Sequence, residues 1–215
     1  MGQHVDDGLK GSPVRLWKLI ERRALTPAGP EREAIDRRIW DLFGEEWAVM
    51  FTDLSGFSRQ VAAFGIIHFL QIIHEQKKLF LPYVEERDGI LVKVEADSFL
   101  ILFKRARAAL ECAVEMQRAS VRANEGRAPE EKILLCVGIG YGAMLRIGDD
   151  DVFGAEVNAA SKLGEDTAGA GEILVTEGAR AAAGVLKDLT YEPLDAVVPG
   201  AGACWRVHWT VGVPR

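Results

Sequence analysis

A carboxylate directly follows a short apolar segment in FTDLSGFS, residues 51–58. The apolar residues before Asp53 favour a buried strand, and the turn containing Gly56 favours the start of a helix. Backbone N–H groups at such a turn attract phosphate, and a carboxylate beside them can hold a divalent cation whose other ligands are phosphate oxygens and water. The alternative is an Asp53 that only caps the helix, and this fragment alone favours that alternative.

Two further polar segments could contribute to the same site. In KVEAD, residues 93–97, the two-residue period of a strand puts Lys93 and Asp97 on one face. In DVFGAEVNAASK, residues 151–162, Asn158 and Lys162 are four residues apart on an expected helix, where amide and ammonium donors would suit an anionic substrate. Solvated polar faces are the simpler interpretation of each segment taken alone.

The elements that must position these groups follow from hydrophobic periodicity. Two helices are expected between residues 14 and 44, separated by TPAGP at 26–30, because two prolines and a glycine cannot continue one helix. The other expected helices cover residues 58–86 with a bend near Gly65, 104–124, 153–163 and 177–184. The expected strands cover residues 47–53, 90–96, 97–103, 133–142, 143–147, 169–176, 189–194 and 204–209.

This order predicts an α+β fold with a mainly antiparallel sheet and helices packed on one side, because strands and helices do not alternate as βαβα. The expected division is an N-terminal helical arm over residues 1–45, whose first 12 residues are expected to be disordered, and one domain over 46–215. No GxxxxGK[ST] or GxGxxG motif stands at a strand–helix junction, which excludes the common P-loop and dinucleotide sites.

Composition narrows the function classes further. The chain has 215 residues, 48% hydrophobic and 27% charged, with a net charge of −6, so no nucleic-acid surface is expected. Apolar stretches such as residues 65–73 are too short to span a membrane, and the N-terminus lacks the apolar core of a secretory signal. Three cysteines without CxxC spacing argue against a disulfide framework or structural zinc. A reducing cytoplasm is therefore the expected location.

Taken together and in order, the three segments resemble a known family. FTDLSGFS, then K-x-x-x-D, then D-V-F-G-x-x-V-N-x-x-x-K followed by G-x-I-L-V-T, resemble the catalytic domain of class III nucleotide cyclases, which include adenylate and guanylate cyclases. The resemblance covers about residues 46–185 and leaves the arm outside. It implies the ferredoxin-like nucleotide cyclase fold and conversion of ATP to 3′,5′-cyclic AMP and pyrophosphate.

The resemblance also implies a role for each matched position. Asp53 and Asp97, with the main chain of Leu54, match the site of two Mg²⁺ or Mn²⁺ ions. The main chain of Gly56, Phe57 and Ser58 matches the turn that binds phosphates. The remaining matched residues are Lys93 and Asp151, which would read adenine, Asn158, which would orient the ribose, and Lys162, which would stabilise charge at the α-phosphate.

In this family two protomers share each site, and all of these positions occur in one chain, so the resemblance implies a homodimer. The chain also departs from the pattern. Lys162 replaces the usual Arg and lacks its planar fork. Ala96 replaces a more usual glycine at the hairpin tip and is not expected to need a left-handed conformation. PGAGACWR, residues 199–206, lacks the usual phosphate-binding Lys, for which Arg146 is a candidate substitute.

Three functions remain open at this point. The first is an adenylate cyclase. The second is a catalytically silent cyclase-like domain that binds nucleotide and regulates a partner, which Lys162 favours and the Asp53–Asp97 pair opposes. The third is a cyclase that uses GTP or a pyrimidine nucleotide. A regulatory partner could bind the N-terminal helices, in which no sensor domain is recognisable.

Overall fold

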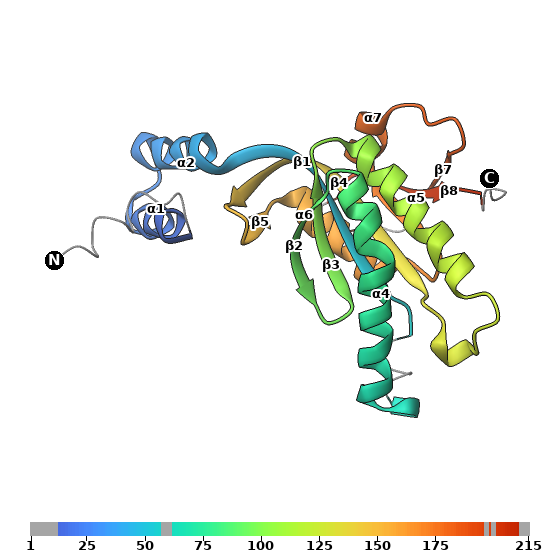
Figure 1. Ribbon diagram of the computed structural model, residues 1–215. Coiled ribbons are helices and arrows are strands. Elements are labelled where there is room, and N and C mark those ends of the chain that lie inside the picture. The colour runs from blue at the N-terminus through green and yellow to red at the C-terminus, as the bar shows by residue number, and fades with distance from the viewer. Residues whose placement is uncertain (1–12, 57–61, 196–197, 199–200, 211–215) are drawn as a thin grey trace.

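The computed structural model describes residues 13–56, 62–195, 198 and 201–210. Its centre is a β-α-β-β-α-β unit, in which a strand and a helix are followed by a hairpin, a second helix and a fourth strand (Figure 1). The elements of this unit are β1 (Gly44–Leu54), α4 (Ile66–Glu86), β2 (Ile90–Glu95), β3 (Ser98–Phe103), α5 (Ala106–Ala123) and β4 (Leu135–Ile147). The order β2-β3-β1-β4 within the sheet is the ferredoxin-like arrangement that the sequence predicts.

The C-terminal part extends this sheet beyond β4. Its elements are β5 (Asp151–Phe153), α6 (Ala155–Ser161), a π-helix (Lys162–Thr167), β6 (Ile173–Thr176), α7 (Glu177–Ala183), β7 (Thr190–Pro193) and β8 (Cys204–His208). In the described part of the chain the sheet has eight strands, in the order β2-β3-β1-β4-β6-β8-β7, with β5 paired to β4. Neighbouring strands are antiparallel except β4 and β6, which confirms a mainly antiparallel α+β fold.

Helices cover both faces of the sheet, so the expectation that they pack on one side is wrong. Alternate residues of β1 belong to two separate cores: Met50 packs with α4, α5 and α7, whereas Val49 packs with α6. Figure 1 shows α4 and α5 side by side along one face. Successive residues of a central strand point to opposite faces of the sheet, so each face contributes apolar side chains to its own core. A sheet with one face exposed to solvent would have polar side chains on that face instead.

Glycines on β4 allow α6 to approach the sheet closely. A Cβ atom at Gly138 would lie 2.2 Å from the carbonyl oxygen of Ala160, and one at Gly140 would lie 2.5 Å from the carbonyl oxygen of Glu156. No other residue type fits where the backbones approach this closely. The helix that carries Asn158 therefore lies directly on the β4 backbone.

The N-terminal arm consists of α1 (Pro13–Leu25) and α2 (Pro30–Phe43), separated at TPAGP as predicted. Apolar residues of both helices form a small core of their own with Ile147 and Leu145 at the end of β4. In Figure 1 the two helices lie at one end of the molecule, and α2 leads into β1. The first 12 residues, expected to be disordered, lie outside the described residues.

Two further expectations differ from the structure in detail. The expected strand pair over residues 133–147 is one strand, β4, because Gly140 and Gly142 are extended and pair with Val49 and Trp47 of β1. The turn comes later, after Ile147, and leads to β5. The expected bend near Gly65 is confirmed as a break, since Gly65 has φ of 84° immediately before α4. Among the described helices, none is long and apolar enough to cross a membrane.

Candidate active site

Two acidic side chains meet where β1 ends and the β2–β3 hairpin turns. Because β1 and β3 are antiparallel, with Thr52 opposite Phe99, the end of β1 lies beside the start of β3. The backbone N–H of Leu54 donates to Asp97 Oδ2 at 3.3 Å, and the Ser98 hydroxyl donates to Asp53 Oδ1 at 3.2 Å. The fold thus brings together the two carboxyl groups that the resemblance pairs, from positions 44 residues apart in the sequence.

Burial and mutual repulsion oppose ionisation of these two groups. Burial first, and the negative charge of Asp97 second, raise the pKa of the Asp53 carboxyl from 3.8 to about 7. Burial likewise raises the pKa of Asp97, whose residue is only 6% exposed, although the N–H of Leu54 favours its charged form. When both carboxyl groups are ionised, their negative charges repel each other in a partly buried place. Their oxygen atoms are hard ligands. A divalent cation of the Mg²⁺ or Mn²⁺ type fits that donor set.

The tip of the β2–β3 hairpin, directly before Asp97, has an unusual backbone conformation. Ala96 has φ of 50°, so the expectation that Ala96 does not need a left-handed conformation is wrong. The tip is held in addition by Gln76 of α4, whose side-chain amide donates to the Asp97 carbonyl oxygen at 2.8 Å. An alanine in this region costs about 1 kcal/mol or more, which the hydrogen bonds that hold Asp97 help to offset.

The turn after β1 is described only in part. Gly56 has φ of 93°, a conformation that favours glycine, and Ser55 donates its N–H to the Leu134 carbonyl oxygen at 2.8 Å. Phe57 and Ser58, the other two residues of the expected phosphate-binding turn, lie outside the described residues.

A pocket of about 250 Å³ opens between the β2–β3 hairpin and the β5–α6 segment. Phe51, Leu100, Val152 and Val157 provide apolar wall, and Ser98 connects the pocket to Asp53. The other lining residues are Lys93, Glu95, Phe99, Asp151, Phe153, Asn158, Ser161 and Glu165. A small concave site with apolar walls and a few polar groups is the usual form of a pocket for an organic ligand.

A lysine and an aspartate form an ion pair at the rim of this pocket. Lys93 Nζ lies 2.5 Å from Asp151 Oδ2, although the two residues are 58 positions apart. The other oxygen of Asp151 accepts the backbone N–H of Val152 at 2.9 Å, which orients the carboxylate. Both side chains are about one third exposed, so a donor and an acceptor stand side by side within reach of a ligand.

Asn158 and Lys162 are placed differently from one another. Asn158 lines the pocket, whereas Lys162 is not among its lining residues, and Lys162 Nζ lies 3.9 Å from Asp166 Oδ2. The Lys162 N–H donates to the Asn158 carbonyl oxygen, so the two residues keep α-helical spacing, and the π-helix begins only at Lys162. The structure thus brings Lys93, Asp151 and Asn158 together and places Lys162 beside them, next to an acidic partner.

Arg146, the candidate substitute for a phosphate-binding lysine, is engaged elsewhere. Its guanidinium lies 4.8 Å from the centre of the Trp47 ring, donates to the Gly148 carbonyl oxygen at 3.0 Å and pairs with Asp149 at 2.7 Å. These contacts fix Arg146 in the turn between β4 and β5, and its side chain is only 16% exposed. The donors of Arg146 therefore stabilise this turn.

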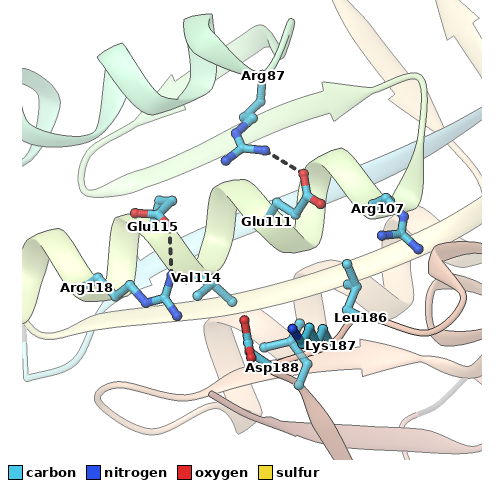
Figure 2. Close-up of a pocket in the computed structure, with 10 residues that line it drawn as sticks. Arg87, Arg107, Glu111, Val114, Glu115, Arg118, Leu186, Lys187 and Asp188 are labelled. Carbon is cyan, nitrogen blue, oxygen red and sulfur yellow. Dashed lines mark hydrogen bonds and ion pairs between the residues drawn. The ribbon is translucent and has the colours of Figure 1, made fainter. Parts of the chain in front are cut away.

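A larger hollow, of about 340 Å³, lies on the other face of the sheet, between α5 and residues 186–189 (Figure 2). Figure 2 shows that its arginines are largely paired: Arg87 with Glu111 at 2.5 Å and Arg118 with Glu115 at 2.8 Å. None of the motif residues lines it. Because two of its arginines are already paired with glutamates and no motif residue lines it, this larger hollow is a weaker candidate for a nucleotide site than the smaller pocket.

Sequence reasoning missed three polar residues of the site. Ser161 and Glu165 line the pocket and bond to each other at 2.5 Å, and Ser98 orients Asp53. Ser161 and Glu165 follow Asn158 by three and seven residues, so their helical spacing was a usable signal. Ser98 had no such signal, because only the pairing of β1 with β3 brings it to Asp53.

Comparisons with known proteins identify a family and similar folds. A model of the family described as adenylate and guanylate cyclase catalytic domain matches residues 44–197. The crystal structure of an adenylate/guanylate cyclase/hydrolase from Silicibacter pomeroyi is similar, with a TM-score of 0.68 and 25% identity, over 80% of this chain and 98% of that one.

Two curated relatives are similar over much of this chain. One is a serine/threonine-protein kinase, pkn2, of Myxococcus xanthus, 29% identical over 71% of this chain and 18% of its own length. The other is a putative adenylate cyclase 3 of Rhizobium meliloti (strain 1021), 29% identical over 68% of this chain and 24% of its own length. The chain thus spans about a quarter or less of the length of these relatives.

Proposed function

Because the chain belongs to the adenylate and guanylate cyclase catalytic domain family, we propose that it converts ATP to 3′,5′-cyclic AMP and pyrophosphate. The observation that carries the choice of ATP is the ion pair of Lys93 and Asp151 in the pocket that Asn158 also lines. Adenine presents an acceptor, N1, next to a donor, the N6 amine. A lysine donor beside an aspartate acceptor complements that edge, and family members that use GTP usually carry Glu and Cys at these positions.

The other residues of the site have separate roles in binding the nucleotide and the metal ions. Asn158 orients the ribose, the apolar wall holds the base, and the main chain around Gly56 binds phosphate. Asp53, Asp97 and the Leu54 carbonyl would hold two Mg²⁺ or Mn²⁺ ions, which when bound lower the pKa of the 3′-hydroxyl and neutralise the triphosphate. The 3′-oxygen then bonds to the α-phosphorus as the bond to the β-phosphate oxygen breaks. Pyrophosphate leaves, and the hydroxyl proton passes to solvent.

Two copies of the chain are proposed to share each site. Asp53 and Asp97 of one copy would act opposite Asn158 and Lys162 of the other, and a twofold axis would create two equivalent sites. Asp53→Ala and Asn158→Ala chains should each be inactive alone. Co-expressed in equal amounts, about half of their dimers are mixed, and each mixed dimer has one site without a mutation. About a quarter of wild-type activity should return. No recovery would mean that each site is built within one chain or that the dimer forms through another surface, such as the N-terminal helices.

The arm and the location complete the proposal. We assign residues 1–45 to an arm that a regulatory partner could bind, since Trp17 and Trp40 on α1 and α2 are 58% and 47% exposed. The catalytic domain covers residues 46–215. The proposed location is the cytoplasm, in keeping with three buried cysteines that form no disulfide.

The decisive experiment offers each of the four nucleoside triphosphates with Mn²⁺ and identifies the products by mass spectrometry. Cyclic AMP should be the main product. A preference for GTP would refute the assignment of Lys93 and Asp151, and a pyrimidine product would assign a different base. Asp53→Ala is the control, because it should abolish formation of every cyclic product.

One observation favours a second candidate, a silent nucleotide-binding domain. Lys162 stands where the family usually has arginine, and its ammonium faces Asp166 at 3.9 Å outside the pocket. Stabilisation of the charge that develops at the α-phosphate would then be weak. Nucleotide binding without product from any triphosphate would establish this candidate in place of the cyclase.

A further inference from the structure

On the side of β4 that faces away from β1, two strands pair with β4, and a stretch of β4 between them has no strand partner. Residues 137–139 pair with β6, and residues 145–147 pair with β5. The Val137 N–H donates across this edge to the Glu172 carbonyl oxygen, so the alternating N–H groups of β4, including that of Tyr141, point the same way. Among the described strands none reaches Tyr141 from this side. An N–H group at such a place needs another acceptor.

A glutamate of α6 supplies that acceptor. Glu156 Oε2 accepts the backbone N–H of Tyr141 at 3.1 Å and the hydroxyl of Thr176 at 2.6 Å. Thr176 ends β6 and caps α7, since its hydroxyl oxygen accepts the N–H of Ala179 at 3.2 Å. One carboxylate therefore connects α6 to β4, to the end of β6 and to the start of α7.

The surrounding backbone leaves room for this carboxylate and little else. A Cβ atom at Gly140 would lie 2.9 Å from Glu156 Oε2, and one at Gly142 would lie 3.0 Å from Glu156 Cγ. The carboxylate thus lies in a space that two glycines keep open. Hydrogen bonds to a charged group in a confined place are strong and narrowly directed, so they restrict where α6 can lie.

We propose that Glu156 is a positioning residue for nucleotide binding, an inference that rests on the proposed cyclase function. Glu156 does not line the pocket, but the segment it anchors carries two residues that do: Asp151, at the start of β5, and Asn158, two residues beyond Glu156. Its bond to Tyr141 closes the gap in the β4 edge and holds this segment against the sheet. Without the bond, Asp151 and Asn158 lose their fixed distance from Lys93 on β2.

The test compares Glu156→Ala and Glu156→Gln with two controls. Glu125→Gln changes an exposed glutamate in the turn just after α5, and Phe80→Leu weakens the core between α4 and α5, away from α6. Amide hydrogen exchange at Tyr141, measured by NMR without nucleotide, should speed up about tenfold or more in Glu156→Ala. Glu156→Gln, which keeps an oxygen acceptor, should show a smaller increase. Glu125→Gln should show none, and any increase in Phe80→Leu should be shared by neighbouring amides of β4 rather than confined to Tyr141.

The kinetic arm separates positioning from mere loss of stability. In Glu156→Ala the KM for ATP should rise about tenfold and kcat should fall, with partial rescue in Glu156→Gln, because small displacements of binding groups cost this much. Phe80→Leu should lower the Tm while leaving KM unchanged. Unchanged exchange at Tyr141, or faster exchange with wild-type KM and kcat, would overturn the inference.

The proposed function can fail separately. If the wild-type chain forms no cyclic product, the Kd of a non-hydrolysable ATP analogue, measured by calorimetry, replaces KM. A rise of about tenfold in Glu156→Ala would still support the positioning role, and an unchanged Kd would refute it.

Discussion

Replacing Asp53 with asparagine should stabilise the metal-free protein at alkaline pH while abolishing its activity. The pKa of Asp53 is raised by burial and by Asp97, so ionising this carboxyl costs folding free energy. Because its folded-state pKa lies above its unfolded-state value, the contribution of Asp53 is most favourable at low pH and is lost as the pH rises from about 4 to about 7. Asparagine keeps the shape and an acceptor for Ser98 but never ionises.

The shift from 3.8 to about 7 corresponds to about 4 kcal/mol, which is the upper limit of the gain because Asp97 shares the effect. We expect Asp53→Asn to gain about 1–4 kcal/mol at pH 8.5 in a chelator. For a domain of this size the Tm should rise by about 2–4 °C for each kcal/mol. At pH 5 the folded-state carboxyl is protonated while the unfolded-state carboxyl is already ionised, so the gain should fall to roughly a third of its value at pH 8.5.

Thermal unfolding monitored by circular dichroism at both pH values measures this difference. Asp188→Asn, at an exposed position, is the matched control and should leave the Tm unchanged at either pH. Addition of Mn²⁺ should stabilise the wild-type protein and reduce or reverse the advantage of Asp53→Asn. An Asp53→Asn protein no more stable than wild type at pH 8.5 in chelator would refute the buried, repulsive placement of these two carboxyl groups.

Three further predictions concern the base, the α-phosphate and the packing of α6. In the double variant Lys93→Glu, Asp151→Cys, kcat/KM for ATP should fall by orders of magnitude, and kcat/KM for GTP should rise by a smaller factor. Retained ATP turnover would exclude recognition of adenine by this pair. Lys162→Arg should raise kcat by about tenfold with little change in KM, because a planar fork suits phosphate oxygens better; an unchanged kcat would remove this side chain from the transition state. Gly138→Ala should lower the free energy of unfolding by several kcal/mol, measured in urea, because its Cβ would lie 2.2 Å from the Ala160 carbonyl oxygen; a loss below about 1 kcal/mol would contradict that close approach.

Local patterns in the sequence were sufficient to predict which segments form helices or strands and where most of these elements begin and end. The break at TPAGP, the hairpin with Asp97 at its tip and the long amphipathic α5 are each decided by residues near in sequence, through backbone restriction and periodicity. The order of elements then excluded an alternating parallel fold. The second strand pair was mispredicted because glycines 140 and 142, which usually mark turns, instead lie under α6.

The candidate site divides in the same way. The three motifs named Asp53, Lys93, Asp97, Asp151 and Asn158, because residue type and spacing within each motif are local properties. Contact across the motifs, such as Lys93 with Asp151 over 58 residues, follows from strand pairing and could be expected only by resemblance.

The amino-acid sequence on its own determined which groups the site has available: two carboxylates, a lysine–aspartate pair and an amide, each on an identifiable element. Only the tertiary structure decided the pKa values of these groups and how they are positioned relative to one another. The pKa of Asp53 depends on what buries it, and the anchoring of α6 by Glu156 depends on a gap between β5 and β6. These properties arise from distances between segments remote in sequence, and no local pattern encodes such distances.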